Sequence, residues 1–312
     1  MVNVDTTTRA IVQAGTREGV RSARAAASDG RLPTGAQRLG FAGSVAKVFL
    51  WTFLLCLAAV VIYPLLWMVL NGFKTNSELF GSPFALPVEY NWDNYAKAWN
   101  AGVSNYLTTS IIVTVTSTIS TVFISAWAAY GLTRVNIPFN KVVVMIVLGG
   151  LMLAPAVALV PLVKMFQGLG LYNTMWALII LYTAFRIPFT TFLIRAYMID
   201  LPREIDEAAE VDGASKWTAF WTIILPMCKP IIVSTVILHI LFAWNEYLFA
   251  MVFTSGTGVQ TLPVGLTSLL SKHGTDYPVV FAGMVIAAIP VVALFFLSQR
   301  YFVKGLADGI GK

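Results

Sequence analysis

The chain has 312 residues, of which 57% are hydrophobic and only 12% are charged, and its mean hydropathy is +0.75. These values exclude an ordinary soluble globular domain and predict an integral membrane protein. The net charge of +6 comes from basic residues scattered over loops and tails, without a stripe that alternates with aromatic side chains, so a nucleic-acid-binding protein is disfavoured.

Residues 1–47 are one of the two charge-rich parts of the chain, and seven of them are Arg or Lys. This segment is too long and too rich in arginine for a signal peptide, and no small-residue cleavage site precedes Val48. We therefore expect a disordered cytoplasmic tail over residues 1–47, followed by a membrane domain over residues 48–312.

Six apolar stretches follow the tail, each of them long enough, or nearly so, to cross a hydrocarbon core as a helix of about 20 residues. They are approximately residues 48–70, 107–132, 142–163, 176–194, 231–253 and 280–302. The expected fold class is therefore an all-α integral membrane protein with six transmembrane helices.

Basic residues are distributed unequally between the two sides of these spans. If the N-terminus is inside, sixteen of the 21 Lys and Arg residues lie on the inner side. The outer side then has only Lys74, Lys97, Lys164 and Lys272. Because short cytoplasmic flanks hold an excess of basic residues, this pattern predicts that both termini are cytoplasmic.

The third span contains two prolines, Pro155 and Pro161. A proline inside a membrane helix frees backbone groups, which are tolerated only where protein or a water-filled cavity satisfies them. We therefore predict a broken helix, which either borders a transport pathway or forms a kink packed against a neighbour.

The second charge-rich part is the loop 195–230 between the fourth and fifth spans, which contains EAAEVDGASKWTAFWTIILP. Pro202 suits the first turn of a helix and the acidic residues after it suit the helix dipole, so a helix is predicted from about Pro202 to Asp212. Gly213 ends this helix, and Ser215 caps a second short helix that Pro226 stops.

One side of the first helix has small side chains that would let another backbone come close. Ile205, Ala208 and Ala209 share this side, next to a charged side that includes Glu207. The pattern favours a docking surface for a soluble partner. The alternative is an amphipathic helix packed on its own bundle or on lipid headgroups, although an acidic face suits an anionic leaflet poorly.

The loop resembles the EAA loop of ATP-binding-cassette (ABC) importer permeases. The pattern E-A-A-x3-G-x9-I-x-L-P is matched position for position by Glu207, Ala208, Ala209, Gly213, Ile223, Leu225 and Pro226. Five segments in and around the loop resemble the sugar-importer branch, whose type member is the smaller maltose permease subunit. They are AAYGLTR (128–134), LPREIDEAAEVDGAS (201–215), LPMCKP (225–230), WNEYLFA (244–250) and TLPVGL (261–266).

This resemblance covers roughly residues 48–312 and implies a type I ABC importer permease (MetI-like) fold in a bacterial plasma (inner) membrane. It implies that the EAA segment, with Asp212 at its end, forms a coupling helix seated in an ATP-hydrolysing subunit. It also implies the other partners: a second homologous permease subunit, two ATP-binding subunits in all, and an extracellular sugar-binding protein. The cargo would be a carbohydrate, with a polyol, a glycerol phosphate or a peptide as alternatives in the same architecture.

The sequence has no G-x4-G-K-[ST] phosphate-binding loop. ATP and Mg²⁺ are therefore expected on partner chains, and this chain is expected to be a transport subunit without enzymatic activity or a cofactor of its own. A transporter driven by an ion gradient is disfavoured, because it would be expected to have a carboxylate relay at mid-membrane, whereas one Glu is found there.

Four polar residues fall within the predicted spans, where a charge costs at least about 2.5 to 3.5 kcal/mol. They are Arg186, His239, Asn245 and Glu246, candidates for the pathway or for contacts between helices. We expect Arg186, which departs from the pattern of related permeases, to pair with Glu246. We expect His239 to make an interhelical hydrogen bond rather than to bind cargo.

Overall fold

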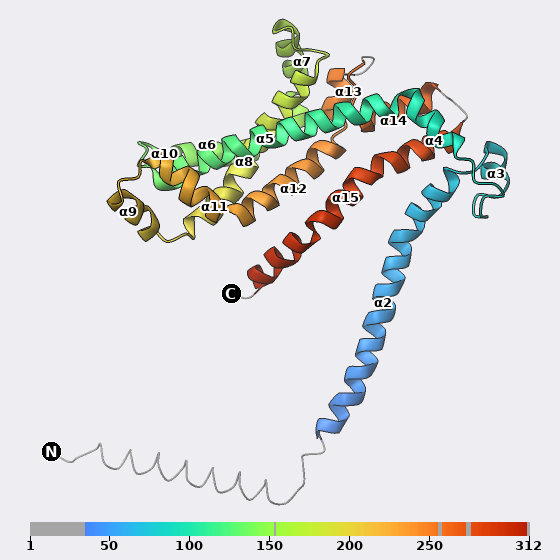
Figure 1. Ribbon diagram of the computed structural model, residues 1–312, viewed down its shortest axis with the longest axis horizontal. Helices are drawn as coiled ribbons and strands as arrows, with labels where there is room; N and C mark the ends of the chain where they lie inside the picture. The colour runs from blue at the N-terminus through green and yellow to red at the C-terminus, as the bar shows by residue number, and fades with distance from the viewer. Residues whose placement is uncertain (1–34, 153, 255–257, 273–275, 311–312) are drawn as a thin grey trace, which may run out of the picture. The chain divides into compact units, whose positions relative to one another are not determined.

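The computed structural model describes residues 35–152, 154–254, 258–272 and 276–310, and every regular element in these ranges is a helix (Figure 1). The predicted all-α fold class is thus confirmed for the described residues. The chain divides into two units, residues 1–65 and 66–312, which we describe separately.

The described part of the first unit belongs to one helix. This helix, α2, runs from Gly35 to Asn71, and its stretch Ala46–Asn71 is apolar enough to cross a membrane, with a mean hydropathy of 2.6. It contains the predicted first span but begins before Val48. Residues 1–34 of the predicted tail lie outside the described residues.

The second unit starts with an ordered segment of short elements. They are α3 (Asn76–Gly81), α4 (Asp93–Ala98) and the π-helical turn η1 (Trp99–Val103). A capping box begins α3, since the backbone amide of Thr75 donates to the Glu78 carboxylate at 2.9 Å, and this hydrogen bond lowers the pKa of Glu78. Lys74 is buried, and its ammonium donates to the carbonyls of Ser82 and Pro83 at 3.1 and 3.0 Å.

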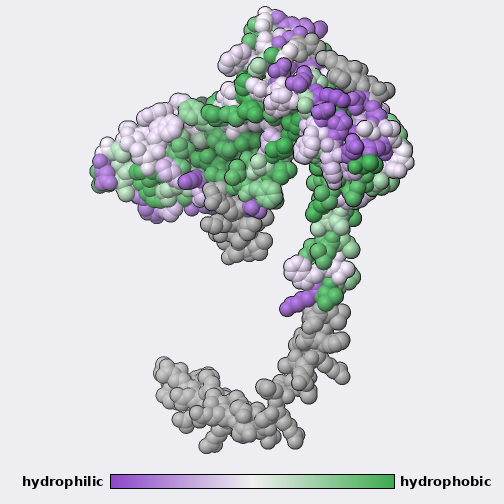
Figure 2. Space-filling model, turned by 45° about the vertical axis from the view of Figure 1, so that its right-hand side comes forward, coloured by the Kyte–Doolittle hydropathy of each residue, from purple (hydrophilic) through white to green (hydrophobic). Residues whose placement is uncertain are grey.

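The bundle of the second unit is built from long helices and broken ones. Its elements are α5 (Ser104–Arg134), α6 (Asn140–Gly150), η2 (Pro155–Ala158), α7 (Leu159–Gly168), α8 (Met175–Ile199), α12 (Lys229–Asn245), α13 (Leu248–Thr254), α14 (Leu262–Lys272) and α15 (Tyr277–Ile310). Four described helices could cross a membrane, α2 included, or six spans if each of two bent helix pairs counts as one. Figure 2 shows hydrophobic residues over the middle of the bundle and hydrophilic residues toward its ends.

Small hydroxyl side chains line the buried face of α5, where it packs on α8 and α12. They are Thr109, Ser110, Thr114, Ser117, Thr118, Thr121 and Ser125. Small residues let membrane helices approach closely, and hydroxyl groups can bond across the interface. Ser125 Oγ, for example, donates to the carbonyl of Ile187 in α8 at 3.3 Å.

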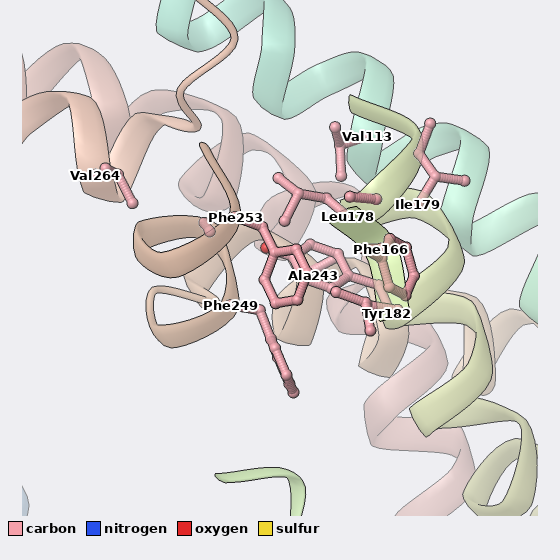
Figure 3. Close-up of a cluster of buried hydrophobic side chains, with 12 residues drawn as sticks. Val113, Phe166, Leu178, Ile179, Tyr182, Ala243, Phe249, Phe253 and Val264 are labelled. Carbon is pink, nitrogen blue, oxygen red and sulfur yellow. The ribbon is translucent and has the colours of Figure 1, made fainter. Parts of the chain in front are cut away.

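A cluster of buried apolar side chains joins α8 to α7, α12 and α13 (Figure 3). Phe166 and Phe253 meet edge to face with ring centroids 5.4 Å apart, and Tyr182 lies in the same cluster. The short helices α7 and α13 are thus fixed to the bundle by aromatic packing.

The predicted break in the third span is confirmed at Pro155, where η2 begins, and α6 and α7 meet there at 87°. Pro161 lies in the first turn of α7 without ending it, because that turn needs no amide donor at this position. On α6, a Cβ added at Gly150 would lie 3.0 Å from Cγ of Pro188, so glycine is what lets α6 approach α8 this closely.

The fifth span differs from the prediction. A single helix over 231–253 is wrong, because α12 ends at Asn245 and α13 begins only at Leu248. The backbone at Glu246 is extended, with φ of −69° and ψ of 126°. The break falls at Asn245 and Glu246, two polar residues within an otherwise apolar stretch.

Candidate functional site

The loop between α8 and α12 folds as two short helices joined at a glycine. The first, α9, covers Glu204–Val211, and Gly213 follows with φ of +78°, a left-handed conformation that favours glycine. The second, α10 (Lys216–Ala219), starts after Ser215, whose Oγ accepts a hydrogen bond from the Thr218 amide at 3.1 Å. The predicted helix, turn and second helix are therefore confirmed.

The end of the second helix is displaced from its predicted position. The helix continues through η3 (Phe220–Ile224) and α11 (Leu225–Met227), and the chain bends by 76° into α12 at Cys228. The prediction that Pro226 stops the helix is wrong by two residues. Pro226 follows directly on the π-helical turn η3, where the regular α-helical bonding pattern is already interrupted.

A buried cluster beneath the loop holds it to the ends of α5, α8 and α12. We call it the loop-anchoring cluster, and it comprises Ala126, Ala129, Tyr130, Ile194, Met198, Phe220, Ile224 and Cys228. Ile205 of α9 packs against it, as do Ile223 and Leu225 of the second helix. The apolar part of the EAA pattern thus serves to attach the loop to the bundle.

The inward packing of α9 corrects one expectation. Ala209 is only 4% exposed and Ile205 lies against the loop-anchoring cluster, whereas Ala208 is exposed. Residues four apart share a helix face, so Ile205 and Ala209 point the same way and Ala208 is turned away from them. Ala208 is therefore the one member of the predicted small-residue side that remains open to a partner.

Arg134, the last residue of α5, ties the loop down through polar contacts. Its Nη1 lies 2.9 Å from Oδ2 of Asp206, and its Nη2 donates to the carbonyls of Met198 and Leu201, both at 2.8 Å. The Arg134 side chain is only 5% exposed. A planar guanidinium can make all three contacts at once, which a lysine ammonium at the same distance from the backbone cannot reproduce.

The outward face of α9 combines carboxylates with small apolar side chains. Glu207 and Ala208 are exposed, and so is Val211, at 88%. Asp212 and Gly213 are exposed at the end of the helix. The residues of the EAA pattern therefore divide into an inner set that anchors the loop and an outer set available to a partner.

Glu246 occupies the break between α12 and α13 and caps the second of these helices. Its Oε1 accepts from the amide of Phe249 at 2.9 Å, and its Oε2 accepts from the amide of Ala250 at 3.1 Å and from Tyr182 Oη at 2.7 Å. Tyr182 and Phe249 are labelled in Figure 3. The expected ion pair of Arg186 with Glu246 is wrong, since none joins these two described residues, and both carboxylate oxygens are already used.

Arg186 lies between two aromatic rings. Its Cζ is 4.6 Å from the ring centroid of Phe189 and 4.6 Å from that of Phe242. These distances are those of cation–π contacts, in which the ring face attracts the positive charge. Nε of Arg186 is buried and has no hydrogen-bond partner among the described residues.

The two remaining candidates make local contacts. His239 Nε2 and Ser117 Oγ are 3.2 Å apart and both side chains are buried, which confirms the expected interhelical hydrogen bond. Asn245 is exposed, and its Nδ2 donates to the carbonyl of Leu241 in its own helix at 2.7 Å. In the described ranges, no group of three or more His, Cys, Asp or Glu side chains is placed to hold a metal ion.

Sequence reasoning missed Arg134 and Tyr182 as organising residues. Arg134 had a signal, because it ends a long apolar stretch and the loop that it binds is the most acidic segment between spans. Tyr182 had none. It is one aromatic residue in an apolar helix, and its partner Glu246 is 64 residues away.

Two solved structures share this fold. The first is a bacterial ABC transporter involved in the import of the acidic polysaccharide alginate, with a TM-score of 0.73, 22% identity, and coverage of 87% of this chain and 100% of the other. The second is a bacterial alginate ABC transporter in complex with an alginate pentasaccharide-bound periplasmic protein, with a TM-score of 0.62 and 14% identity over 85% of this chain and 96% of the other. The expected permease fold is confirmed.

Curated relatives match over most of their length. The probable ABC transporter permease protein YurM of Bacillus subtilis is 44% identical over 85% of this chain and 88% of its own. The trehalose/maltose transport system permease protein MalG of Thermococcus litoralis is 35% identical over 81% and 92%. The diacetylchitobiose uptake system permease protein NgcG of Streptomyces coelicolor is 34% identical over 85% and 87%.

Residues 122–308 match the model of one family, and this range holds the loop from α8 to α12 with its anchoring cluster. The resemblance inferred from the EAA pattern is confirmed by this match and by the relatives. The chain belongs to the family of binding-protein-dependent transport system inner membrane components.

Proposed function

We propose that this chain is the membrane-spanning permease subunit of an ABC importer that moves a carbohydrate into the cytoplasm, with ATP hydrolysed on partner subunits. Relatives named for trehalose/maltose, diacetylchitobiose and melibiose/raffinose/stachyose support a carbohydrate cargo. A protein pathway is needed because each unpaired hydroxyl costs several kcal/mol in hydrocarbon, and a sugar carries many. A polyol or glycerol phosphate importer of the same architecture is the alternative.

The observation that carries this proposal is the division of the loop into an anchored side and an open side. The outer set includes Glu207, Ala208 and Val211, while Arg134 and the loop-anchoring cluster hold the inner side to α5, α8 and α12. A partner that moves α9 would therefore move the ends of three bundle helices with it. This is the property that a coupling element requires.

The remaining subunits follow from the same proposal. A second homologous permease would complete the pathway, two ATP-binding subunits would dock on the cytoplasmic face, and an extracellular sugar-binding protein would deliver cargo from the other side. The distribution of Lys and Arg supports cytoplasmic termini and a cytoplasmic α9 in a bacterial inner membrane.

The test reverses the charge on the open face of α9. In Glu207→Lys, the new lysine should repel the basic groups of the partner that an acidic helix face attracts. Co-purification of the ATP-binding subunit should fall about tenfold or more, which corresponds to a loss of about 1.4 kcal/mol in binding free energy. Uptake of labelled sugar should fall with it. The matched control is Glu89→Lys, a reversal at another exposed position in the segment before α4, which should leave co-purification unchanged.

Protein levels in the membrane show whether each variant is inserted. If Glu207→Lys is inserted normally and retains both uptake and ATPase association, α9 is not the coupling element. If the wild-type transporter moves no carbohydrate but does move a polyol or glycerol phosphate, the cargo assignment fails while the coupling role stands.

A further inference from the structure

Arg186 lies near the middle of a membrane-spanning helix. Eleven residues of α8 precede it and thirteen follow it, so it is about 17 Å and about 20 Å along the helix from the two ends. At this depth its charge is costly, and such residues mark functional sites unless a partner explains them.

No described acidic side chain neutralises Arg186. Glu246 is the acidic partner expected from the sequence. It already accepts hydrogen bonds from two backbone amides and from Tyr182. No hydrogen bond or ion pair joins Arg186 to another described residue, and its contacts are the two cation–π contacts. The guanidinium therefore has hydrogen-bond donors that no described residue uses.

The surroundings of Arg186 suit a carboxylate. Phe189 and Phe242, from α8 and α12, hold the guanidinium at 4.6 Å from each ring centroid. A planar guanidinium binds a carboxylate through two parallel hydrogen bonds. Arg186 is half-buried, so it remains accessible in the isolated chain.

We propose that Arg186, Phe189 and Phe242 form a subsite on the transport pathway for an anionic carbohydrate, one that carries a carboxylate such as a uronic acid. This inference rests on the proposed function and narrows its substrate class. The carboxylate of the cargo supplies the missing counter-charge, and the two rings, which contact the guanidinium, hold it in position for that carboxylate. A neutral sugar would leave the guanidinium unpaired in the membrane, which is the unfavourable case.

The experiment uses the complete transporter with its partner proteins, reconstituted in liposomes that hold ATP on the cytoplasmic side. Transport is measured for a panel of uronic-acid oligosaccharides and their neutral counterparts, such as digalacturonate and galactobiose. The wild type should transport an acidic member, and Arg186→Gln should reduce that transport at least tenfold. Arg186→Lys, which keeps the charge but not the planar fork, should fall between them.

Two controls separate the site from general damage. Arg195→Gln removes the same charge from the last turns of the same helix and should leave transport of the acidic sugar unchanged. Phe242→Leu should weaken it severalfold, and Phe242→Tyr, which keeps an aromatic ring, should restore it.

Four results would overturn the inference. Transport of neutral members only, or equal transport by the wild type and Arg186→Gln, would exclude an anion subsite. Loss of the second permease from purified Arg186→Gln would assign Arg186 to a contact between subunits. Transport of no carbohydrate at all by the wild type would refute the proposed function as well, and this result differs from the other three.

Discussion

Gly213 shows how one backbone conformation determines the shape of the loop. Its φ of +78° lies in the left-handed region, and a Cβ added there would meet nothing within 4 Å. A side chain at this position would therefore have room, and only its backbone would be strained. This makes Gly213 a clean probe of the turn between α9 and α10.

Replacing Gly213 with valine should cost about 1 to 2 kcal/mol in the observed turn and tilt α9 out of place. Co-purification of the ATP-binding subunit should decrease about 5- to 30-fold, with normal protein levels in the membrane. Gly170→Val is the matched control, because Gly170 also has a positive φ, +68°, and open space, but follows α7. Equal loss of ATPase association in both variants would contradict a specific role for Gly213.

Arg134 acts at the same scale through charge rather than backbone shape. Arg134→Gln removes the contacts to Asp206, Met198 and Leu201, each worth up to about 1.5 to 3 kcal/mol when a charged group is involved. The amides of α9 should then exchange hydrogen about 10- to 150-fold faster in the full chain. Arg203→Gln, at an exposed position beside the same helix, should leave their exchange unchanged. Unchanged exchange in Arg134→Gln would show that apolar packing alone holds the loop.

At the scale of elements, the break between α12 and α13 depends on one carboxylate. Glu246 satisfies two free amides at the start of α13 and the hydroxyl of Tyr182 in α8. A short helix has few hydrogen bonds of its own, so its stability comes from its cap and its packing. Phe249 and Phe253 supply that packing in the cluster of Figure 3.

Glu246→Ala should therefore destabilise α13 and leave the buried Tyr182 hydroxyl without its acceptor. The unfolding free energy should fall by about 1.5 to 3 kcal/mol, measured as a lower unfolding temperature of the purified protein. Glu246→Gln, which keeps one acceptor oxygen, should cost less. A double-mutant cycle with Tyr182→Phe isolates the side-chain pair, and strictly additive effects would contradict the contact.

At the scale of the whole molecule, the family and the basic residues together predict how the chain is oriented. The coupling role that we propose requires the EAA loop to face the compartment that holds ATP, and the predicted topology places most of the Lys and Arg residues on that same side. The contacts within the helix bundle do not determine this orientation, because they are the same whichever way the bundle is inserted into the membrane.

Labelling with an impermeant maleimide tests this orientation on intact cells. In a background without Cys56 and Cys228, Ser77→Cys should be labelled, and Ser215→Cys should be labelled only after the membrane is permeabilised. Both positions are exposed, so access to the reagent differs only by the side of the membrane. Strong labelling at Ser215→Cys in intact cells would refute the predicted topology.

The sequence by itself determined the helical membrane class, the approximate spans, and the helix, glycine turn and second helix of the EAA loop. These features follow from apolar composition, from proline and glycine geometry and from helix caps, which are local properties of the chain. The EAA pattern also identified the family, because its residues lie within one short stretch of the sequence.

Only the tertiary structure decided which side of α9 is open, where the fifth span breaks and which partner each polar residue takes. The outcome for Ala208 and Ala209 depends on the cluster beneath them, and the break at Glu246 depends on Tyr182, 64 residues earlier. The same holds for Arg186. The sequence predicts that it pairs with Glu246, whereas in the structure it lies between two aromatic rings. Contacts between helices are set by how the helices pack, and a sequence pattern within one helix does not identify the residues that lie opposite it.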